Sequence, residues 1–296
     1  MAKQGVQNFG GGWTEDKLKS VQKYLAAYAT IMQKQKFKFA YIDAFAGTGY
    51  REQKTQDKTS SESLLAADLA GEEPQKFLDG SARVALKVEP RFDRYIFIEK
   101  NETRFKELEG LKSEFPDKAK DIQLINADAN TFLKDFCNKK WNAHRAVIFL
   151  DPYGMQVHWD TIQTIAKTKA IDLWILFPLG SGVSRLLRRD GQIDQAMREK
   201  LDNLFGEKDW YDAFYEKKKQ QSLFTDEVSV EKVASFKSIE KYFVSRLKTI
   251  FPSVAPNPLP LYNSKNVPLF LLCFAAANEK GGPTAVKIAR DILRKK

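Results

Sequence analysis

The chain has 296 residues, of which 43% are apolar and 29% are charged, a composition typical of a soluble globular protein with one large domain or two small ones. Its net charge of +10 favours an anionic partner, with nucleic acid as the first candidate, although many soluble proteins are also basic. No apolar run approaches the roughly 20 residues that cross a bilayer, and Met1–Gly12 lacks the apolar core of a signal peptide, so we expect a cytoplasmic protein without membrane contact.

Cysteine and histidine are scarce in this chain. Two of each occur, which excludes a dense disulfide framework and leaves too few ligands for a structural zinc site, so we expect no metal. Cys137 and Cys273 both lie in apolar sequence and are most simply buried thiols. Neither His144 nor His158 lies in a recognisable setting for a nucleophilic triad.

The most informative stretch follows a predicted helix over residues 14–32. Phe37–Ile42 is an aromatic and apolar run, typical of a strand buried in a parallel sheet, and Asp43 comes directly after it. Gly47 and Gly49 then allow backbone angles and close approaches that a Cβ blocks. An acid at a strand end before a Gly-x-Gly turn suggests a cofactor site at the carboxyl edge of an α/β sheet.

Three interpretations of this turn are open. It is an ordinary strand-turn, a dinucleotide fold, or a site for S-adenosylmethionine, in which an acid before the glycines helps to hold the methionine end. The dinucleotide-binding fingerprint requires a third glycine at the position where this chain has Glu52, which disfavours that interpretation. We favour S-adenosylmethionine, and the predicted cofactor contacts in this stretch are Asp43, Ala44, Phe45, Gly47 and Gly49.

The next three predicted strands also end near acids. The strand over 94–98 ends in Glu99, which is well placed to accept hydrogen bonds from ribose hydroxyls or is simply solvated. The strand over 122–125 precedes Asp128, which can bond an adenine amine or cap the following helix. The strand over 146–150 runs into Asp151. We expect all these acids to lie along one carboxyl edge, and we expect Glu99 and Asp128 to bind the cofactor.

The remaining segments are predicted from their patterns. The irregular residues 50–79 are a lid, a substrate loop or a disordered segment. After a fifth strand over 172–177, a helix over 184–205 puts Arg185, Arg188 and Arg189 on one face, which either grips nucleic-acid phosphates or is solvated. Lys217–Lys219 is interpreted as solvated and 229–251 as a helix. A hairpin over 259–276 and a helix over 283–293 close the chain.

This order of elements defines an expected fold. Five alternations of strand and helix imply a mostly parallel sheet with helices on both faces. A terminal hairpin that inserts one antiparallel strand is the arrangement of the Rossmann-like, class I methyltransferases, whose sheet has seven strands. We therefore predict a single domain over 1–296, with a lid or substrate insertion at 50–79 and a helical insertion at 184–251.

Asp151, Pro152 and Tyr153 have the parts that methylation of an aromatic amine needs. A carboxylate and a backbone carbonyl can accept the two N–H bonds of the amine and favour its pyramidal form, while an aromatic ring stacks on the base. Asp-Pro and Gly are also common turn residues, so a simple turn remains the alternative. The sequence Asp-Pro-Tyr resembles the Asp-Pro-Pro-Tyr signature of amino-methyltransferases that act on nucleic acids, without its second proline.

From Trp13 to Leu293 the chain also resembles the three-Cys-motif partner family of bacterial methyltransferase-like proteins. The resemblance is carried by Tyr41–Gly49, Gly80-Ser81, Phe97–Glu99 and Leu150–Gly154, which occur in the family's order. It implies a cysteine-bearing protein partner encoded nearby.

The predicted function is an S-adenosylmethionine-dependent N-methyltransferase that acts on an exocyclic base amine of DNA or RNA. The alternative is a non-catalytic module that binds cofactor or nucleic acid and serves a partner protein. A methyltransferase for small molecules or proteins is a third possibility, which the basic charge disfavours.

Overall fold

The computed structural model describes residues 12–48, 80–221 and 226–294. Its helices, in chain order, are α1 (Gly12–Met32), α3 (Ser81–Leu86), α4 (Glu102–Leu108), α5 (Gly110–Glu114), α6 (Ala129–Cys137), α7 (Trp159–Lys167), the π-helix η1 (Leu179–Val183), α8 (Ser184–Leu186), α9 (Gln195–Phe205), α10 (Trp210–Phe214), α11 (Phe236–Ile250) and α12 (Gly282–Ile292). Its strands are β1 (Lys38–Asp43), β2 (Arg94–Glu99), β3 (Ile122–Asn126), β4 (His144–Leu150), β5 (Ile171–Phe177), β6 (Tyr215–Gln221), β7 (Asp226–Lys232), β8 (Ser253–Val254), β9 (Leu259–Tyr262) and β10 (Pro268–Ala276).

The central sheet has the strand order β3-β2-β1-β4-β5-β10-β8, and β9 also pairs with β10. Strands β1 to β5 are parallel, and β10 runs antiparallel to β5. Because β9 pairs with residues 268–272 of β10 and β8 with residues 275–276, the two short strands together fill the outermost place. Eight strands thus occupy seven places. The predicted fold is confirmed: a mostly parallel sheet, helices on both faces and a C-terminal antiparallel pair.

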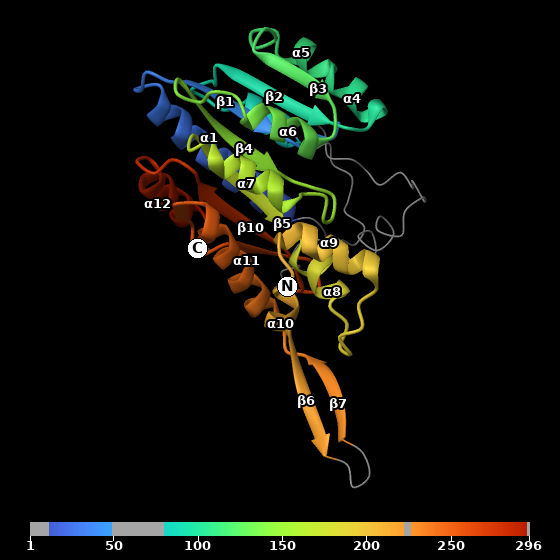
Figure 1. Cartoon of the computed structure of the whole chain (residues 1–296). Helices are drawn as coiled ribbons and strands as arrows, with labels where there is room; N and C mark the ends of the chain where they lie inside the picture. The colour runs from blue at the N-terminus through green and yellow to red at the C-terminus, as the bar shows by residue number, and fades with distance from the viewer. Residues whose placement is uncertain (1–11, 49–79, 222–225, 295–296) are drawn as a thin grey trace, which may run out of the picture.

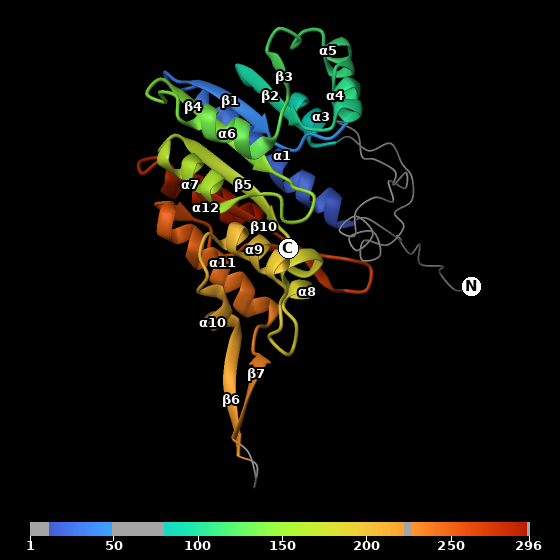
Figure 2. The same cartoon turned by 45° about the vertical axis from the view of Figure 1, so that its right-hand side comes forward.

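Helices cover both faces of the sheet (Figures 1 and 2), and the two faces bury different side chains. Alternation along a strand sends successive residues to opposite faces. Tyr41, Phe149 and Trp174 pack toward the side of α1 and α12, where the core is rich in aromatic rings. Ile42 and Ile148 pack toward the side of α6, α7 and α11, where the sheet contributes mostly aliphatic side chains. The face of the sheet on which an acid lies therefore determines which helix can contact it.

The segment 184–251 differs from its predicted pattern in two places. The helix expected over 184–205 is interrupted, because α8 ends at Leu186, Gly191 has a φ of +70°, and a new helix begins beyond the cap residue Asp194. The helix expected over 229–251 begins at Phe236, because residues 226–232 pair with β6. The resulting β6–β7 hairpin, which includes the lysines of 217–219, projects from the body of the protein (Figures 1 and 2).

No helix in the described ranges combines the length and the apolar composition needed to cross a bilayer.

Candidate active site

The four predicted acids follow strands that lie side by side. Asp43 and Glu99 are the last residues of β1 and β2, Asp151 directly follows β4, and Asp128 lies two residues beyond β3. Since these strands are parallel neighbours, their carboxyl ends meet at one edge of the sheet. Strand β1 lies between β2 and β4, so the turn after Asp43 is at the centre of the group.

The glycine turn is tied to both neighbouring strands. The N–H of Ala44 donates to the carbonyl of Phe149 across 3.1 Å, and the N–H of Ala46 donates to that of Ile98 across 3.0 Å. Gly47 donates to Oε2 of Glu99 across 3.0 Å. Its φ of +59° is a conformation that favours glycine, and an added Cβ meets no described residue within 4 Å. Among the described residues, the turn therefore offers open space beside a fixed backbone. Gly49 and the predicted lid at 50–79 lie outside the described residues.

The carboxyl group of Asp43 is completely buried. Its Oδ1 accepts a hydrogen bond from the N–H of Phe45 at 3.3 Å. Burial raises the pKa of Asp43 to about 7; the hydroxyl of Ser81 opposes this rise, the charge of Asp151 adds to it, and the N–H of Phe45 and the charge of Lys17 also oppose it. Asp43 thus shares its surroundings with Asp151, and it is hydrogen-bonded both to the turn and to Ser81 in α3.

Asp151 forms an ion pair with a lysine of the first helix. Nζ of Lys17 in α1 donates to its Oδ2 across 2.5 Å, and the two side chains are 7% and 19% exposed. The ammonium also lies 5.4 Å from the ring centroid of Trp13 and 6.0 Å from that of Phe149. Lys17, Asp43 and Asp151 therefore form one charged cluster at the end of β1 and β4, on the α1 side of the sheet.

The loop after Asp151 is fixed by a buried asparagine. Nδ2 of Asn130 in α6 donates to the carbonyl of Gln156 across 2.8 Å. Its Oδ1 accepts from the N–H of His158 at 3.0 Å and from the hydroxyl of Thr161 at 2.9 Å. Pro152 is buried in this loop, whereas the side chain of Tyr153 is 53% exposed. The loop thus presents an aromatic ring to the surface beside a fixed carboxylate.

Glu99 accepts a second hydrogen bond, and Asp128 caps a helix and forms an ion pair. Oε1 of Glu99 accepts from the N–H of Asn101 at 2.7 Å, while the residue remains half-buried. Oδ1 of Asp128 caps α6 by accepting from Asn130 and Thr131, and its Oδ2 pairs with Lys100 at 3.3 Å. Burial acts to raise the pKa of Asp128, but these N–H groups and Lys100 hold it below its ordinary value. The structure thus shows the capping role of Asp128, and an adenine contact stays a prediction.

The three predicted phosphate-binding arginines do not share a helix face. Arg185 is in the short α8, whereas Arg188 and Arg189 follow it in an irregular segment, because buried Leu187 has a ψ of 90° and ends the helix. All three are exposed, and Arg188 pairs with Asp190 at 3.4 Å. The carbonyl of Arg188 accepts from the hydroxyl of Tyr215, and that of Arg189 from the N–H of Lys232, so the hairpin base holds this segment.

Two residues at the site, Lys17 and Asn130, are absent from the sequence-based set. Lys17 lies four residues before Val21 and seven before Tyr24, so it occupies the buried face of α1. A lysine on an apolar helix stripe is the signal that could have revealed it. Asn130 has no comparable signal, because its role depends on the position of a loop 26 residues away.

No group of three or more His, Cys, Asp or Glu side chains in the described part of the chain could hold a metal ion.

Comparisons with known proteins bear on the fold. No family model and no curated protein matches this chain. Among solved structures, a Legionella pneumophila protein of the family DUF519 is similar over 96% of this chain and 92% of its own, with a TM-score of 0.51 and 14% identity. At this identity the likeness shows the fold alone.

Two other solved structures are similar at lower scores. A spermidine synthase in complex with a transition-state analogue covers 87% of this chain and 59% of its own, with a TM-score of 0.38 and 11% identity. An rRNA methylase from Streptococcus thermophilus covers 72% and 95%, with a TM-score of 0.29 and 12% identity. These scores are too low to carry an argument. The observed fold, a mostly parallel α/β sheet closed by an antiparallel strand pair, is shared with the Legionella protein over most of both chains.

Proposed function

We propose that this protein is an S-adenosylmethionine-dependent N-methyltransferase that acts on an exocyclic base amine of nucleic acid. The observation that carries the proposal is the shared cluster of Asp43, Asp151 and Lys17 beside the glycine turn. Had Asp43 and Asp151 faced different regions, one site could not use both.

The residues at the turn fit a nucleoside cofactor. No described residue fills the space beside Gly47, so a ligand can approach the backbone there. Glu99 is half-buried, and a carboxylate has about four acceptor positions, so ribose hydroxyls can bind beside the two N–H groups it already accepts. In this proposal the methionine end of the cofactor binds beside the glycine turn. The residues concerned are Asp43, Ala44, Phe45, Gly47 and Gly49. In the same proposal Asp128, which follows the neighbouring strand β3, would contact the adenine. When bound, the cofactor supplies an electrophilic methyl group.

The end of β4 fits the target amine. Oδ2 of Asp151 is taken by Lys17, whereas its Oδ1 has no hydrogen-bond partner among the described residues. The carbonyl of Pro152 likewise accepts no hydrogen bond from that part of the chain. Two acceptors on adjacent residues would hold both N–H bonds of a base amine and orient its lone pair toward the methyl group that the bound cofactor would supply. The exposed ring of Tyr153 can stack on the base.

The positive charge supports a nucleic-acid substrate. The net charge is +10, and Arg185, Arg188 and Arg189 are exposed on a segment that follows η1. An added Cβ at Gly182 in η1 lies 3.3 Å from Cγ of Met155, so η1 lies beside the loop after Asp151. The arginines therefore lie on a segment that starts beside this loop. From there they can bind phosphates of the nucleotides next to the target base.

The resemblance to the three-Cys-motif partner family adds a protein partner to this proposal. A cysteine-bearing protein encoded nearby is implied by that resemblance alone. It would determine which nucleic acid reaches the site, and a copurification experiment with the neighbouring gene product tests it.

A radiolabelled methyl-transfer screen over RNA, DNA and protein tests the proposed activity. We expect label on nucleic acid, and a loss of about 100-fold or more in Asp151→Asn. Asp135→Asn is the matched control, because Asp135 is exposed on α6, and it should behave as the wild type. Calorimetry should show that Asp151→Asn still binds the cofactor. Absence of cofactor binding by folded protein contradicts the proposal, and binding without any transfer favours a non-catalytic module.

A further inference from the structure

A basic hollow lies at the opposite edge of the sheet from the candidate active site. It has a volume of about 670 Å³ and lies where α6 and α7 end and β4 and β5 begin. Five of its lining residues carry positive charge, and none of its described lining residues is Asp or Glu. The cations are Lys139, Lys140, Arg145, Lys167 and Lys169.

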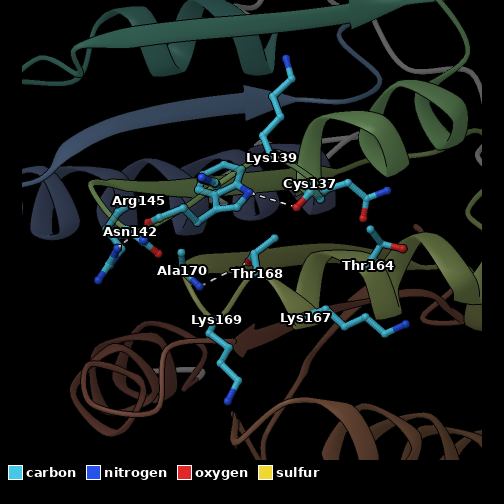
Figure 3. A pocket seen from close by; sticks show the side chains of 12 residues that line it. Cys137, Lys139, Asn142, Arg145, Thr164, Lys167, Thr168, Lys169 and Ala170 are labelled. Carbon is cyan, nitrogen blue, oxygen red and sulfur yellow. Dashed lines mark hydrogen bonds between the residues drawn. The ribbon is translucent and has the colours of Figure 1, made fainter.

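Most of these cations have no anionic partner within the part of the chain that the structure describes. Lys169 pairs with Glu279 at 2.8 Å. No carboxylate among the described residues lies within ion-pair distance of Lys139, Lys140 or Lys167, and all three are exposed. Figure 3 shows Lys139, Lys167 and Lys169 extending from the hollow in different directions, as suits contacts spread along an extended anion rather than around one small ion.

Hydrogen bonds and a ring contact hold the residues at the floor of the hollow. Nε1 of Trp141 donates to the carbonyl of Cys137 across 3.1 Å. The guanidinium of Arg145 lies 3.7 Å from the ring centroid of Phe37 and donates to the carbonyls of Trp141 and His144. Its Nε is buried and has no hydrogen-bond partner among the residues that the structure describes. The other lining residues are largely polar, with Asn and Thr side chains, so the hollow lacks the apolar walls typical of a small-molecule site.

Helix ends explain part of this charge. Lys167 is the last residue of α7 and Lys139 follows the end of α6, where cations complement the helix dipole. That effect does not account for Arg145 at the start of a strand or for the absence of acids among the described lining residues. If the helix dipole alone explained these lysines, their removal would change the stability of the protein and leave ligand binding unchanged.

We propose that this hollow binds backbone phosphates of the same nucleic acid whose base is methylated at the opposite edge. This inference rests on the proposed function. Arg145 and Asp151 lie at the two ends of β4, six residues apart, which corresponds to about 20 Å at about 3.3 Å per residue. Stacked nucleotides advance about 3.4 Å each, so a strand that contacts both edges is longer than about six nucleotides. A stacked 4-nucleotide strand is then too short to contact both edges.

Binding of short and long oligonucleotides tests this inference. The variant is Lys139→Gln, Lys140→Gln and Lys167→Gln combined, and the probes are 4-nucleotide and 24-nucleotide RNA and DNA in fluorescence anisotropy at several salt concentrations. We expect about tenfold or greater loss of affinity for the 24-mer, with a salt slope reduced by about 0.7 to 0.9 for each lost phosphate contact. Affinity for the 4-mer and for the cofactor should be unchanged.

The matched control removes the same charge elsewhere, with Lys106→Gln, Lys112→Gln and Lys120→Gln, which are exposed residues near α4, α5 and β3. Equal losses in both triple variants overturn the inference, because net charge alone then explains binding. Saturable binding of inorganic phosphate that the hollow variant loses, with 24-mer affinity intact, overturns it in favour of a small phosphate ligand. If Asp151→Asn fails to reduce transfer while the hollow variant still loses 24-mer affinity, the proposed function fails and the hollow remains.

Discussion

Lys17 and Asp151 form an ion pair across 134 positions of sequence, with Nζ and Oδ2 at 2.5 Å. The pair ties the first helix to the end of the central strand. We expect Lys17→Met to lower methyl transfer about 10- to 100-fold, because Asp151 loses the contact that orients it. The variant should also raise the pKa of Asp43 above its value of about 7, since the charge of Lys17 lowers that pKa. Transfer assays and carboxyl NMR titration measure the two effects.

Lys19→Met is the control for this prediction, because Lys19 lies on the exposed side of the same helix. Its activity should match the wild type. Equal activity in Lys17→Met and Lys19→Met contradicts a positioning role for the ion pair.

Asn130 is predicted to hold the loop that carries Tyr153. Its three hydrogen bonds to Gln156, His158 and Thr161 are lost in Asn130→Ala, at a cost of about 1–3 kcal/mol for buried polar groups left unpaired. We expect the turnover number to fall while cofactor affinity stays the same, because the loop lies on the substrate side. Asn203→Ala, at an exposed position of α9, is the control. A uniform loss of both turnover and cofactor affinity would contradict this assignment.

Asp172 should make stability depend on pH. It is buried at the start of β5, and its Oδ2 accepts from the hydroxyl of Tyr24 across 2.6 Å. Burial raises its pKa to about 7, although the Tyr24 hydroxyl and the charge of Arg145 oppose the rise. The folded state therefore keeps a proton that the unfolded state releases near pH 4. Stability from this group is complete below about pH 4 and falls until about pH 7, by an amount on the order of 4 kcal/mol.

Asp172→Asn removes this dependence while keeping an acceptor for Tyr24. In urea unfolding at pH 5 and pH 8, the variant should gain several kcal/mol relative to the wild type as pH rises. The difference between the two proteins isolates Asp172 from Asp43, whose pKa is raised in the same direction. A difference that does not change with pH shows that Asp172 is ionised throughout.

Gly180 is predicted to allow the close packing of η1 against β10. A Cβ there would lie 2.2 Å from the carbonyl oxygen of Pro268, which belongs to the backbone of β10. Gly180→Ala should therefore push η1 from the sheet and destabilise the fold by about 1–3 kcal/mol, measured by urea unfolding. Gly110→Ala, where an added Cβ meets nothing within 4 Å, should be neutral or slightly stabilising. Equal stability of the two variants contradicts the close packing of η1.

The central sheet could be predicted because its strands carry strong local signals. Runs such as Ala146–Leu150 are apolar without interruption, and each of β1, β2 and β4 ends at an acid or just before one. The acids at one edge then follow from parallel strands alone. Their individual partners do not follow, since Asp43 has internal hydrogen bonds and Asp128 caps a helix.

The β6–β7 hairpin and the break after α8 could not be predicted in the same way. Lys217–Lys219 has no apolar alternation, so its strand forms through pairing with residues 228–230 rather than through burial of one face. The break at Leu187 lies in a run of leucine and arginine that fits a helix equally well. Tertiary contacts with Tyr215 and Lys232 decide the conformation there.

The outermost place of the sheet bears on how this protein meets other chains. The short strands β8 and β9 are separated by Pro256 and Pro258, and β9 itself contains Pro260. Proline has no backbone N–H, so this border offers an incomplete row of donors to any incoming strand. Growth of the sheet into a second molecule is disfavoured on that side, and the protein is protected from strand-to-strand aggregation there.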